Sequence, residues 1–373
     1  MRHPKSPSCF SGTYAEARRK FLDAATHRDA VIESFVHAMK GEFGEVLATD
    51  AAFIGASDAE ELLIISSATH GAEGFCGSGC QVATLDDDDL LERLRQTGVA
   101  LMLIHAVNPY GFSYVQRTNE DNVDLNRNCV SFGAPLPVNA EYAAIDPLLV
   151  PVSWPPTAAD EAAMAAYIER EGSDSFMATV SAGQYTEPDG LFYGGSAPSW
   201  SNRTVRAILR KYGASALDIA WIDVHTGLGP YGHGEKIYAG RNSPADVARA
   251  RTLWGADVFT PFHGDSASVE VMGPLVSTIH DECPQARAAL IALEFGIAPI
   301  EESLLGLRAQ QWLRRHPEAP AAQRRAIRQQ VRDVAYCDTD EWKGMVLGQC
   351  RAAVLQAIQG LRTDEGESHF PIS

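Results

Sequence analysis

The chain has 373 residues, of which 45% are hydrophobic and 21% charged, so a disordered protein is excluded as the default and a sizeable globular core is expected. The formal net charge of −17 argues against nonspecific binding to nucleic acid or to an anionic membrane, since both need clustered lysine and arginine. No apolar run approaches the roughly 18 residues of a transmembrane helix, and the N-terminus lacks a signal-peptide pattern, so we expect a cytoplasmic protein.

The seven cysteines are irregularly spaced and include no CxxC pair, which favours a reducing compartment over a disulfide framework. Cys76 and Cys80 are four residues apart, a spacing that suits one face of a helix. Metal binding by these two thiolates is an alternative, but no second pair of cysteine or histidine completes a cysteine-rich zinc site.

The N-terminal third predicts a helical segment followed by alternating strands and helices. Residues 13–40 show helical spacing of apolar side chains, such as Phe21 and Ala25 and then Val31, Phe35 and Met39. Short apolar runs predict strands, and a helical pattern separates the last two of them. The strands are expected at 45–55, 61–68 and 99–108, with the helix around 84–98. Apolar strands alternating with helices indicate a largely parallel sheet with both faces covered.

Residues 131–157 are rich in proline and lack periodicity, which suits either a long loop bordering a site or a domain linker; we favour the loop. The remaining chain continues the alternation. Helices are expected at 158–182 and 198–213, strands at 216–225, 235–240 and 288–296, and a mostly helical tail at 301–361. We expect a single domain, with a helical N-terminal segment at 13–40, a core at 41–300 and a helical C-terminal segment at 301–361.

The stretch "SSATHGAEGFCGSGC", residues 66–80, places His70 and Glu73 three residues apart directly after an apolar strand. Its four glycines predict a flexible loop that could bring both side chains onto one metal ion. The alternative is a polar turn with a helix cap, because an HxxE pattern is common by chance. Carboxyl ends of strands in open α/β sheets are where ligands bind, which favours the first interpretation.

Three further segments carry candidate side chains. "NVDLNRN" at 122–128 contains Asp124, Asn126 and Arg127, and "WIDVHTGLG" at 221–229 contains Asp223 and His225. The third is an apolar run that Glu294 interrupts.

A carboxylate inside a buried strand costs several kcal/mol unless it is paired or used. Glu294 is therefore either an ion-pair partner of Arg117 or Arg127, or a general base whose pKa is tuned by burial.

Together these residues could form a hydrolytic metal site. Two histidines and one carboxylate are a sufficient ligand set for catalytic zinc and leave one position for water. Glu294 could take a proton from that water, and an arginine could stabilise the oxyanion formed when the water attacks a carbonyl.

The four ordered motifs resemble the zinc carboxypeptidase superfamily, which includes the aspartoacylase and succinylglutamate desuccinylase branch; the closest likeness is to an uncharacterised bacterial branch. The resemblance runs from about residue 40 to 300. It implies, as the strand pattern does, an α/β fold with a mixed, mostly parallel sheet of about eight strands flanked by helices.

The resemblance also implies roles for the site residues. They are one zinc ion per chain on His70, Glu73 and His225, a general base at Glu294, an oxyanion-binding Arg117, a grip on the substrate carboxylate by Asn126 and Arg127, and support of the zinc-binding histidines by Asp124 and Asp223.

The sequence departs from that superfamily in one respect. Carboxypeptidases carry a tyrosine on a mobile loop before the general base, but this chain has no tyrosine between Tyr238 and Tyr336. Tyr185 and Tyr193, in the turn-rich stretch 183–195, could replace the missing phenol. Packing of the loop is the alternative role for both.

We therefore expect a zinc-dependent hydrolase that cleaves an amide bond next to a free carboxylate, with a small peptide as substrate. One alternative is a deacylase of N-acyl amino acids, and another is a catalytically silent relative that binds peptide. Arg127 could instead pair with Asp124 or Asp121, which would leave it unavailable to a substrate. The sequence leaves the oligomeric state open.

Overall fold

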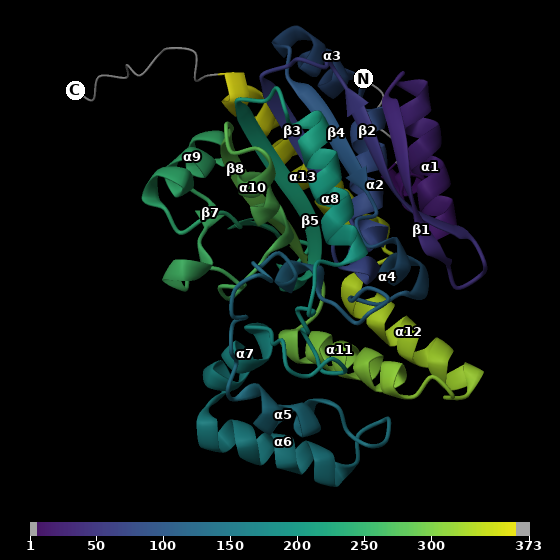
Figure 1. The fold of residues 1–373 in the computed structure, drawn as a ribbon. Coiled ribbons are helices and arrows are strands. Elements are labelled where there is room, and N and C mark those ends of the chain that lie inside the picture. Colours follow the sequence, from purple (N-terminus) through teal and green to yellow (C-terminus); the bar gives the residue numbers. More distant parts are fainter. Residues whose placement is uncertain (1–5, 363–373) are drawn as a thin grey trace.

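The computed structural model of the chain describes residues 6–362. One mixed sheet forms its centre (Figure 1). The eight strands are β1 (Val31–Lys40), β2 (Val46–Ile54), β3 (Glu61–Ser66), β4 (Ala100–His105), β5 (Asp218–Tyr231), β6 (Gly234–Tyr238), β7 (Val258–Phe259) and β8 (Arg287–Gly296). They lie side by side in the order β1-β2-β4-β3-β5-β8-β6-β7.

The middle of the sheet is parallel, because β4, β3, β5 and β8 all run in one direction, whereas β1, β2 and β6 join it by antiparallel pairing. The register places Ser66 opposite Asp223 and His225 opposite Glu294. Parallel strands bring their carboxyl ends to one edge of a sheet, so the residues that follow β3, β5 and β8 meet there. The predicted mixed, mostly parallel sheet of about eight strands is confirmed.

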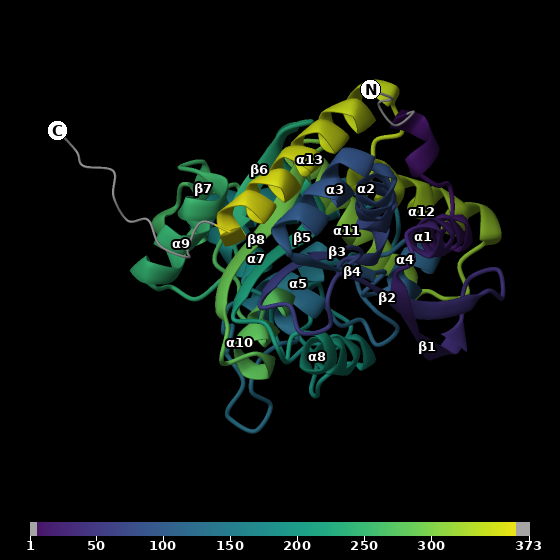
Figure 2. The same cartoon turned by 90° about the horizontal axis from the view of Figure 1, so that it is seen from above.

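Two helical layers cover the sheet (Figure 2). The larger core lies under one layer, where Phe21, Phe75, Trp254 and Trp342 are buried against the strands, and a second core lies under the other layer. The first layer contains α1 (Tyr14–His27), α2 (Gly74–Asp86), α3 (Asp88–Thr97), α9 (Pro244–Trp254) and α13 (Asp340–Arg362); the second contains α8 (Trp200–Tyr212) and α10 (Ile279–Glu282).

A further group of helices lies beyond the carboxyl ends of the parallel strands, at the bottom of Figure 1. These helices share a third apolar core, and the buried Arg308 joins them, since its Nε donates to the carbonyl of Leu149 at 2.9 Å. They are α5 (Tyr142–Leu149), α6 (Ala158–Glu171), α7 (Ser173–Ser181), α11 (Ile300–Arg315) and α12 (Ala321–Ala335), while α4 (Pro109–Tyr114) lies nearer the sheet. Five short 3₁₀ helices complete the described residues: η1 (Ser6–Cys9), η2 (Gly71–Glu73), η3 (Leu125–Arg127), η4 (Pro261–His263) and η5 (Leu275–Thr278).

The prediction of one helical segment over residues 13–40 is wrong in its second half. Helix α1 ends at His27, Asp29 adopts a left-handed φ of 52°, and the chain then enters strand β1. The helical spacing of Val31, Phe35 and Met39 misled the prediction. β-Branched residues in this segment and antiparallel pairing with β2 favour the strand, which leaves Val31 60% exposed at the edge of the sheet.

The prediction of a flexible glycine loop over residues 66–80 is also wrong, because η2 and α2 occupy most of this stretch. A Cβ atom on Gly71 would lie 2.0 Å from the carbonyl carbon of Gly111, and one on Gly74 would lie 2.6 Å from the ring of Phe112. A Cβ on Gly77 would lie 2.7 Å from Ser67. These glycines therefore allow close packing of backbones rather than flexibility.

Two smaller differences concern the middle of the chain. Residues 131–157, predicted as a loop, contain α5, and the helix predicted at 158–182 is broken at Gly172, whose φ is 89°, into α6 and α7. The seven cysteines all lie in the described part of the chain and are not joined by disulfides. Within residues 6–362, no helix combines the length and apolarity that crossing a membrane requires.

Candidate active site

His70, Glu73 and His225 form one buried cluster at the carboxyl edge of the sheet. The Nδ1 atom of His70 lies 2.8 Å from Oε1 of Glu73, and Nδ1 of His225 lies 2.9 Å from Oε2 of the same carboxylate. η2 turns the chain directly after β3 so that Glu73 comes back beside His70, while His225 is supplied by β5. Their potential ligand atoms lie within 4.8 Å of one another. Within residues 6–362, no other group of three or more His, Cys, Asp or Glu residues is placed to hold a metal ion.

Carboxylates support both histidines from behind. Asp223 Oδ2 lies 2.7 Å from Nε2 of His225, and Asp223 itself accepts hydrogen bonds from Ser66 Oγ at 2.6 Å and from Thr69 Oγ1. Nε2 of His70 lies 3.3 Å from Oδ1 of Asp124. The Asp223 contact favours the Nε2–H tautomer of His225 and leaves its Nδ1 as the atom that can bind a metal, whereas Nε2 of His70 lies near Asp124 without a hydrogen bond.

The charges of the cluster match a cation. Burial alone would lower the pKa of His225, but Asp223 and Glu73 raise it well above its usual value. Burial alone would raise the pKa of Glu73, but His70 and His225 lower it. A proton on the His225 imidazole thus offsets the negative charge of Asp223 and Glu73 in this arrangement. Two imidazoles and one carboxylate also fit a divalent metal such as zinc, which would supply that positive charge instead.

Cys76 and Cys80 lie outside this cluster. Both are buried on α2 within the larger core, and Cys80 contacts the thiols of Cys76 and Cys350. The alternative of a thiolate metal site therefore gains no support from their positions.

Glu294 enters the same region from β8, where its side chain is 7% exposed. A bulge in β5, made by the positive φ angles of Gly227 and Gly229, turns the N–H of Leu228 towards Glu294 Oε1 at 3.0 Å. Burial, together with the charge of Glu73, raises the pKa of Glu294 from 4.5 to about 8. Within the described chain, neither Arg117 nor Arg127 forms the ion pair with Glu294 that the sequence left open.

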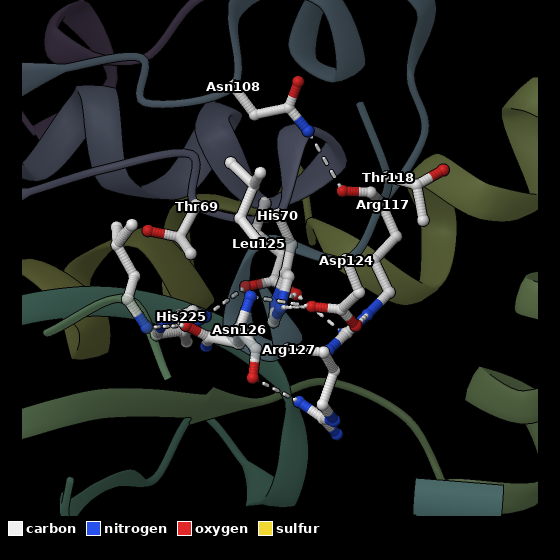
Figure 3. Close-up of polar contacts among 12 residues, drawn as sticks. Thr69, His70, Asn108, Arg117, Thr118, Asp124, Leu125, Asn126, Arg127 and His225 are labelled. Carbon is white, nitrogen blue, oxygen red and sulfur yellow. Dashed lines mark hydrogen bonds and ion pairs between the residues drawn. The ribbon is translucent and has the colours of Figure 1, made fainter. Parts of the chain in front are cut away.

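Arg117 points at the His70–Glu73–His225 cluster (Figure 3). Its Nε donates to Asp124 Oδ2 at 2.9 Å, and its Nη1 lies 3.6 Å from Glu73 Oε1. Its backbone carbonyl accepts from the N–H of Gly71 at 3.1 Å, which ties the arginine to η2. Asp124 thus contacts both Arg117 and His70 and couples their positions.

Arg127 is a buried cation without a carboxylate partner among the described residues. It is 4% exposed, its Nη1 and Nη2 donate to the carbonyls of Asn126 at 3.0 Å and Ser181 at 2.6 Å, and its Nε has no partner (Figure 3). The alternative pairing with Asp124 or Asp121 is not formed. Asn126 Oδ1 accepts from the N–H of Leu275 at 2.9 Å, so its NH₂ group is the part left for a ligand.

These groups line one cavity of about 530 Å³. Two largely apolar surfaces enclose the rest of it. The α12 wall consists of Ala298, Pro299, Ile300, Ser303, Leu304, Leu307, Val331, Val334 and Ala335, and the β6 wall consists of Ile237, Tyr238, Ala239, Gly240, Pro261, Phe262, Ala267, Ser268, Val269, Glu270, Val271 and Pro274.

The two walls adjoin different parts of the site. The carbonyl of Ala335 accepts from Thr226 Oγ1 at 2.5 Å, so the α12 wall borders the His70–Glu73–His225 cluster. The β6 wall borders Asn126, because Leu275 follows Pro274 directly and its N–H binds the Asn126 side chain.

The two tyrosines proposed as the replacement phenol do not line the cavity. Tyr185 donates its hydroxyl to the carbonyl of Arg127 at 2.6 Å, and Tyr193 packs in the second core. Two aromatic residues of the cavity were not predicted from the sequence. Phe192 lines the cavity, and Tyr238 belongs to the β6 wall. An aromatic side chain inside the glycine-rich stretch 183–195 was the available signal for Phe192.

The fold is similar to several solved structures. Carboxypeptidase A from Helicoverpa armigera is 12% identical, covers 86% of this chain and 73% of that chain, and has a TM-score of 0.44. A metallo-carboxypeptidase from Burkholderia cenocepacia is 12% identical, with coverage of 92% and 68% and a TM-score of 0.42. Bovine thrombin-activatable fibrinolysis inhibitor, in complex with tick carboxypeptidase inhibitor, is 12% identical, with coverage of 91% and 98% and a TM-score of 0.43.

No curated protein matches the sequence. Residues 10–349 match the family model described as "Protein of unknown function (DUF2817)". Since this match spans most of the chain, the chain belongs to the DUF2817 family.

Proposed function

We propose that the chain is a metal-dependent hydrolase that cleaves an amide bond next to a free carboxylate. The observation that carries this proposal is the content of one cavity. A buried His-Glu-His cluster, a carboxyl group with a raised pKa and a buried arginine without a carboxylate partner all line it. The ordered motifs that resemble the zinc carboxypeptidase superfamily support the same function.

His70, Glu73 and His225 would hold the metal, which we expect to be one zinc ion per chain. When bound, the metal supplies Lewis-acid chemistry, which makes water more acidic and a substrate carbonyl more electrophilic. Asp124 and Asp223 keep the two imidazoles oriented for that role.

Glu294 is the proton acceptor in this proposal. Its pKa is raised to about 8, and a carboxylate of that basicity suits a group that removes a proton from water and then returns it to the leaving amine. The net reaction adds one water to the amide and releases a carboxylate and an amine. Arg117, held by Asp124, would donate hydrogen bonds to the oxyanion that forms at the attacked carbonyl.

Arg127 and Asn126 would bind the carboxylate of the substrate. A guanidinium that lines the cavity and has no carboxylate partner is suited to a carboxylate, because its planar fork can donate two parallel hydrogen bonds. The side chain next to that carboxylate would meet the β6 wall. Its only charged member is Glu270, which is exposed, so we expect this side chain to be apolar.

The α12 wall favours an N-acyl amino acid over a free dipeptide. This wall borders the metal-binding cluster, where the acyl half of the substrate would lie, and it contains no charged residue. The α-ammonium of a dipeptide would have to enter an apolar surface beside Arg117 without a carboxylate partner from that wall, which is costly. A deacylase of apolar N-acyl amino acids is therefore the second candidate function. A carboxypeptidase that acts on N-blocked peptides would use the same catalytic and substrate-binding residues.

One matched pair of substrates tests both statements. 4-Methylpentanoyl-phenylalanine and leucyl-phenylalanine differ only by the α-ammonium group. The zinc-loaded protein should hydrolyse the acyl compound with a kcat/KM at least about tenfold higher, the equivalent of roughly 1.4 kcal/mol. Preference for leucyl-phenylalanine would favour a peptidase. Zinc binding without hydrolysis of either compound would favour the silent peptide-binding relative.

A further inference from the structure

One aromatic ring contacts both arginines of the cavity. The guanidinium carbon of Arg117 lies 5.0 Å from the centroid of the Phe192 ring, and that of Arg127 lies 5.4 Å from it. Both distances are within the reach of a cation–π interaction. Phe192 itself is 9% exposed and lines the cavity.

The backbone at Phe192 adopts a conformation that bulky residues rarely adopt, with a φ of 53°. Hydrogen bonds of its loop hold it there. The carbonyl of Phe192 accepts from the N–H of Gln184 at 3.2 Å, and the carbonyl of the next residue, Tyr193, accepts from the N–H of Asp124 at 2.8 Å. The backbone at Phe192 is therefore held beside the segment that carries Asp124 and Arg127. Strained backbone that the surroundings over-determine often marks a functional position.

We propose that Phe192 is a positioning residue that holds the guanidinium groups of Arg117 and Arg127 in their separate places in the site. The inference rests on the proposed function, in which Arg117 serves the reacting carbonyl and Arg127 serves the substrate carboxylate. The electron-rich ring attracts both cations without neutralising either of them. A protein carboxylate at the same place would hold Arg127 equally well, but it would compete with the carboxylate of the substrate.

The competing explanation is that Phe192 only packs its loop. Under that explanation an apolar side chain of similar size would serve equally well, and glycine would relieve the positive φ. Phe192→Leu keeps apolar bulk and removes the aromatic face, whereas Phe192→Tyr keeps the face and is the conservative rescue. Both variants keep a side chain at the same backbone position, so they differ chiefly in the ring.

The first readout is binding and does not depend on turnover. Calorimetry would compare N-acetyl-phenylalanine with N-acetyl-phenylalaninamide, using zinc-loaded protein in the Glu294→Gln background. Phe192→Leu should weaken binding of the acid about tenfold, in line with the strength of a desolvated cation–π contact, and should change binding of the amide little. Phe192→Tyr should stay within about threefold of Phe192.

A double-mutant cycle then assigns the effect to the arginine. In an Arg127→Met background, Phe192→Leu should no longer weaken binding of the acid, because residues that act through one another are not additive. With Glu294 intact, Phe192→Leu should also raise KM through Arg127 and lower kcat through Arg117. Thermal melts and zinc content should be measured on every variant to exclude unfolding.

The outcomes separate this inference from the proposed function. If Phe192→Leu binds the acid like the parent protein while Arg127→Met does not, the inference is overturned and the proposed function stands. If the cycle shows coupling but no acyl amino acid is hydrolysed, the positioning role stands and the hydrolase proposal fails. If the parent protein binds acid and amide equally, the role assigned to Arg127 fails and this inference fails with it.

Discussion

Replacing Arg127 with lysine keeps the positive charge but removes the planar fork of the guanidinium group. In the wild type, Arg127 donates to the carbonyls of Asn126 and Ser181 at 3.0 and 2.6 Å and retains a buried Nε–H without a partner. A single ammonium group cannot hold both carbonyls and also present two parallel hydrogen bonds to a ligand. The substrate carboxylate should therefore lose one charged hydrogen bond.

The expected loss of binding affinity follows from the loss of this one hydrogen bond. A hydrogen bond to a charged group contributes about 1.5–3 kcal/mol, which corresponds to a roughly 10- to 150-fold increase in Kd for the acid. Binding of the neutral amide analogue should change little, so the preference for acid over amide should narrow by the same factor. The lost contact with a buried carbonyl should also lower the free energy of unfolding by about 1–2 kcal/mol.

Arg308 offers a matched control. It is 2% exposed, it also donates to two backbone carbonyls, those of Leu149 and Leu148, and it lies outside the cavity; unlike Arg127, it pairs with a carboxylate, Glu161, at 3.1 Å. Arg308→Lys should therefore destabilise the protein by a similar amount and leave the ratio of acid to amide affinity unchanged. Both variants can be compared by calorimetry with N-acetyl-phenylalanine and its amide. A wild type that binds the two ligands equally, or an Arg127→Lys variant that keeps the full preference for the acid, would contradict the role proposed for Arg127.

Three further predictions address the proton acceptor and the packing of the cluster. Glu294→Gln should lower hydrolysis roughly a hundredfold or more while zinc content stays near one equivalent, and near-wild-type turnover would remove Glu294 from the mechanism. In metal-free protein, the pKa of Glu294 is about 8 in the folded state and near 4.5 in the unfolded chain. As pH rises through this window, the unfolded chain releases the proton first, so the free energy of unfolding of the wild type should fall relative to that of Glu294→Gln. Urea titrations should show a fall on the order of 1–4 kcal/mol. A pH-independent difference would contradict the raised pKa. Gly71→Ala should weaken zinc binding and lower the melting temperature, because its Cβ would lie 2.0 Å from the carbonyl carbon of Gly111, whereas Gly133→Ala, with no atom within 4 Å of its Cβ, should do neither.

The sequence was sufficient for the centre of the fold because buried strands leave a strong signal. β3 and β4 are almost completely buried and read as continuous apolar runs, so their positions were predicted to within a few residues. β1 was missed because it lies at the edge of the sheet, where Val31 and Met39 are exposed and no alternation of buried side chains distinguishes strand from helix. Pairing with β2, which decides the matter, is a contact between segments and is not visible locally.

Some features of the site could be predicted from the sequence, and others could not. Side chains at the ends of parallel strands, such as His70, His225 and Glu294, were brought together as expected, because the sheet itself determines where they meet. Two features depend on distant contacts that no local pattern encodes. The close packing of Gly71 against Gly111 and the position of Phe192 beside two arginines both depend on segments far apart in the chain.

A metal titration of hydrolysis tests most directly whether the protein is a zinc-dependent hydrolase. Metal-free protein would receive increasing zinc, and the initial rate with 4-methylpentanoyl-phenylalanine would be measured at each step. We expect no hydrolysis without metal, a rise that saturates at one zinc per chain, and no rise in His225→Ala, because His225 is one of the three proposed ligands. Hydrolysis that is independent of zinc, or full binding of zinc without any hydrolysis, would contradict the proposed zinc-dependent hydrolysis.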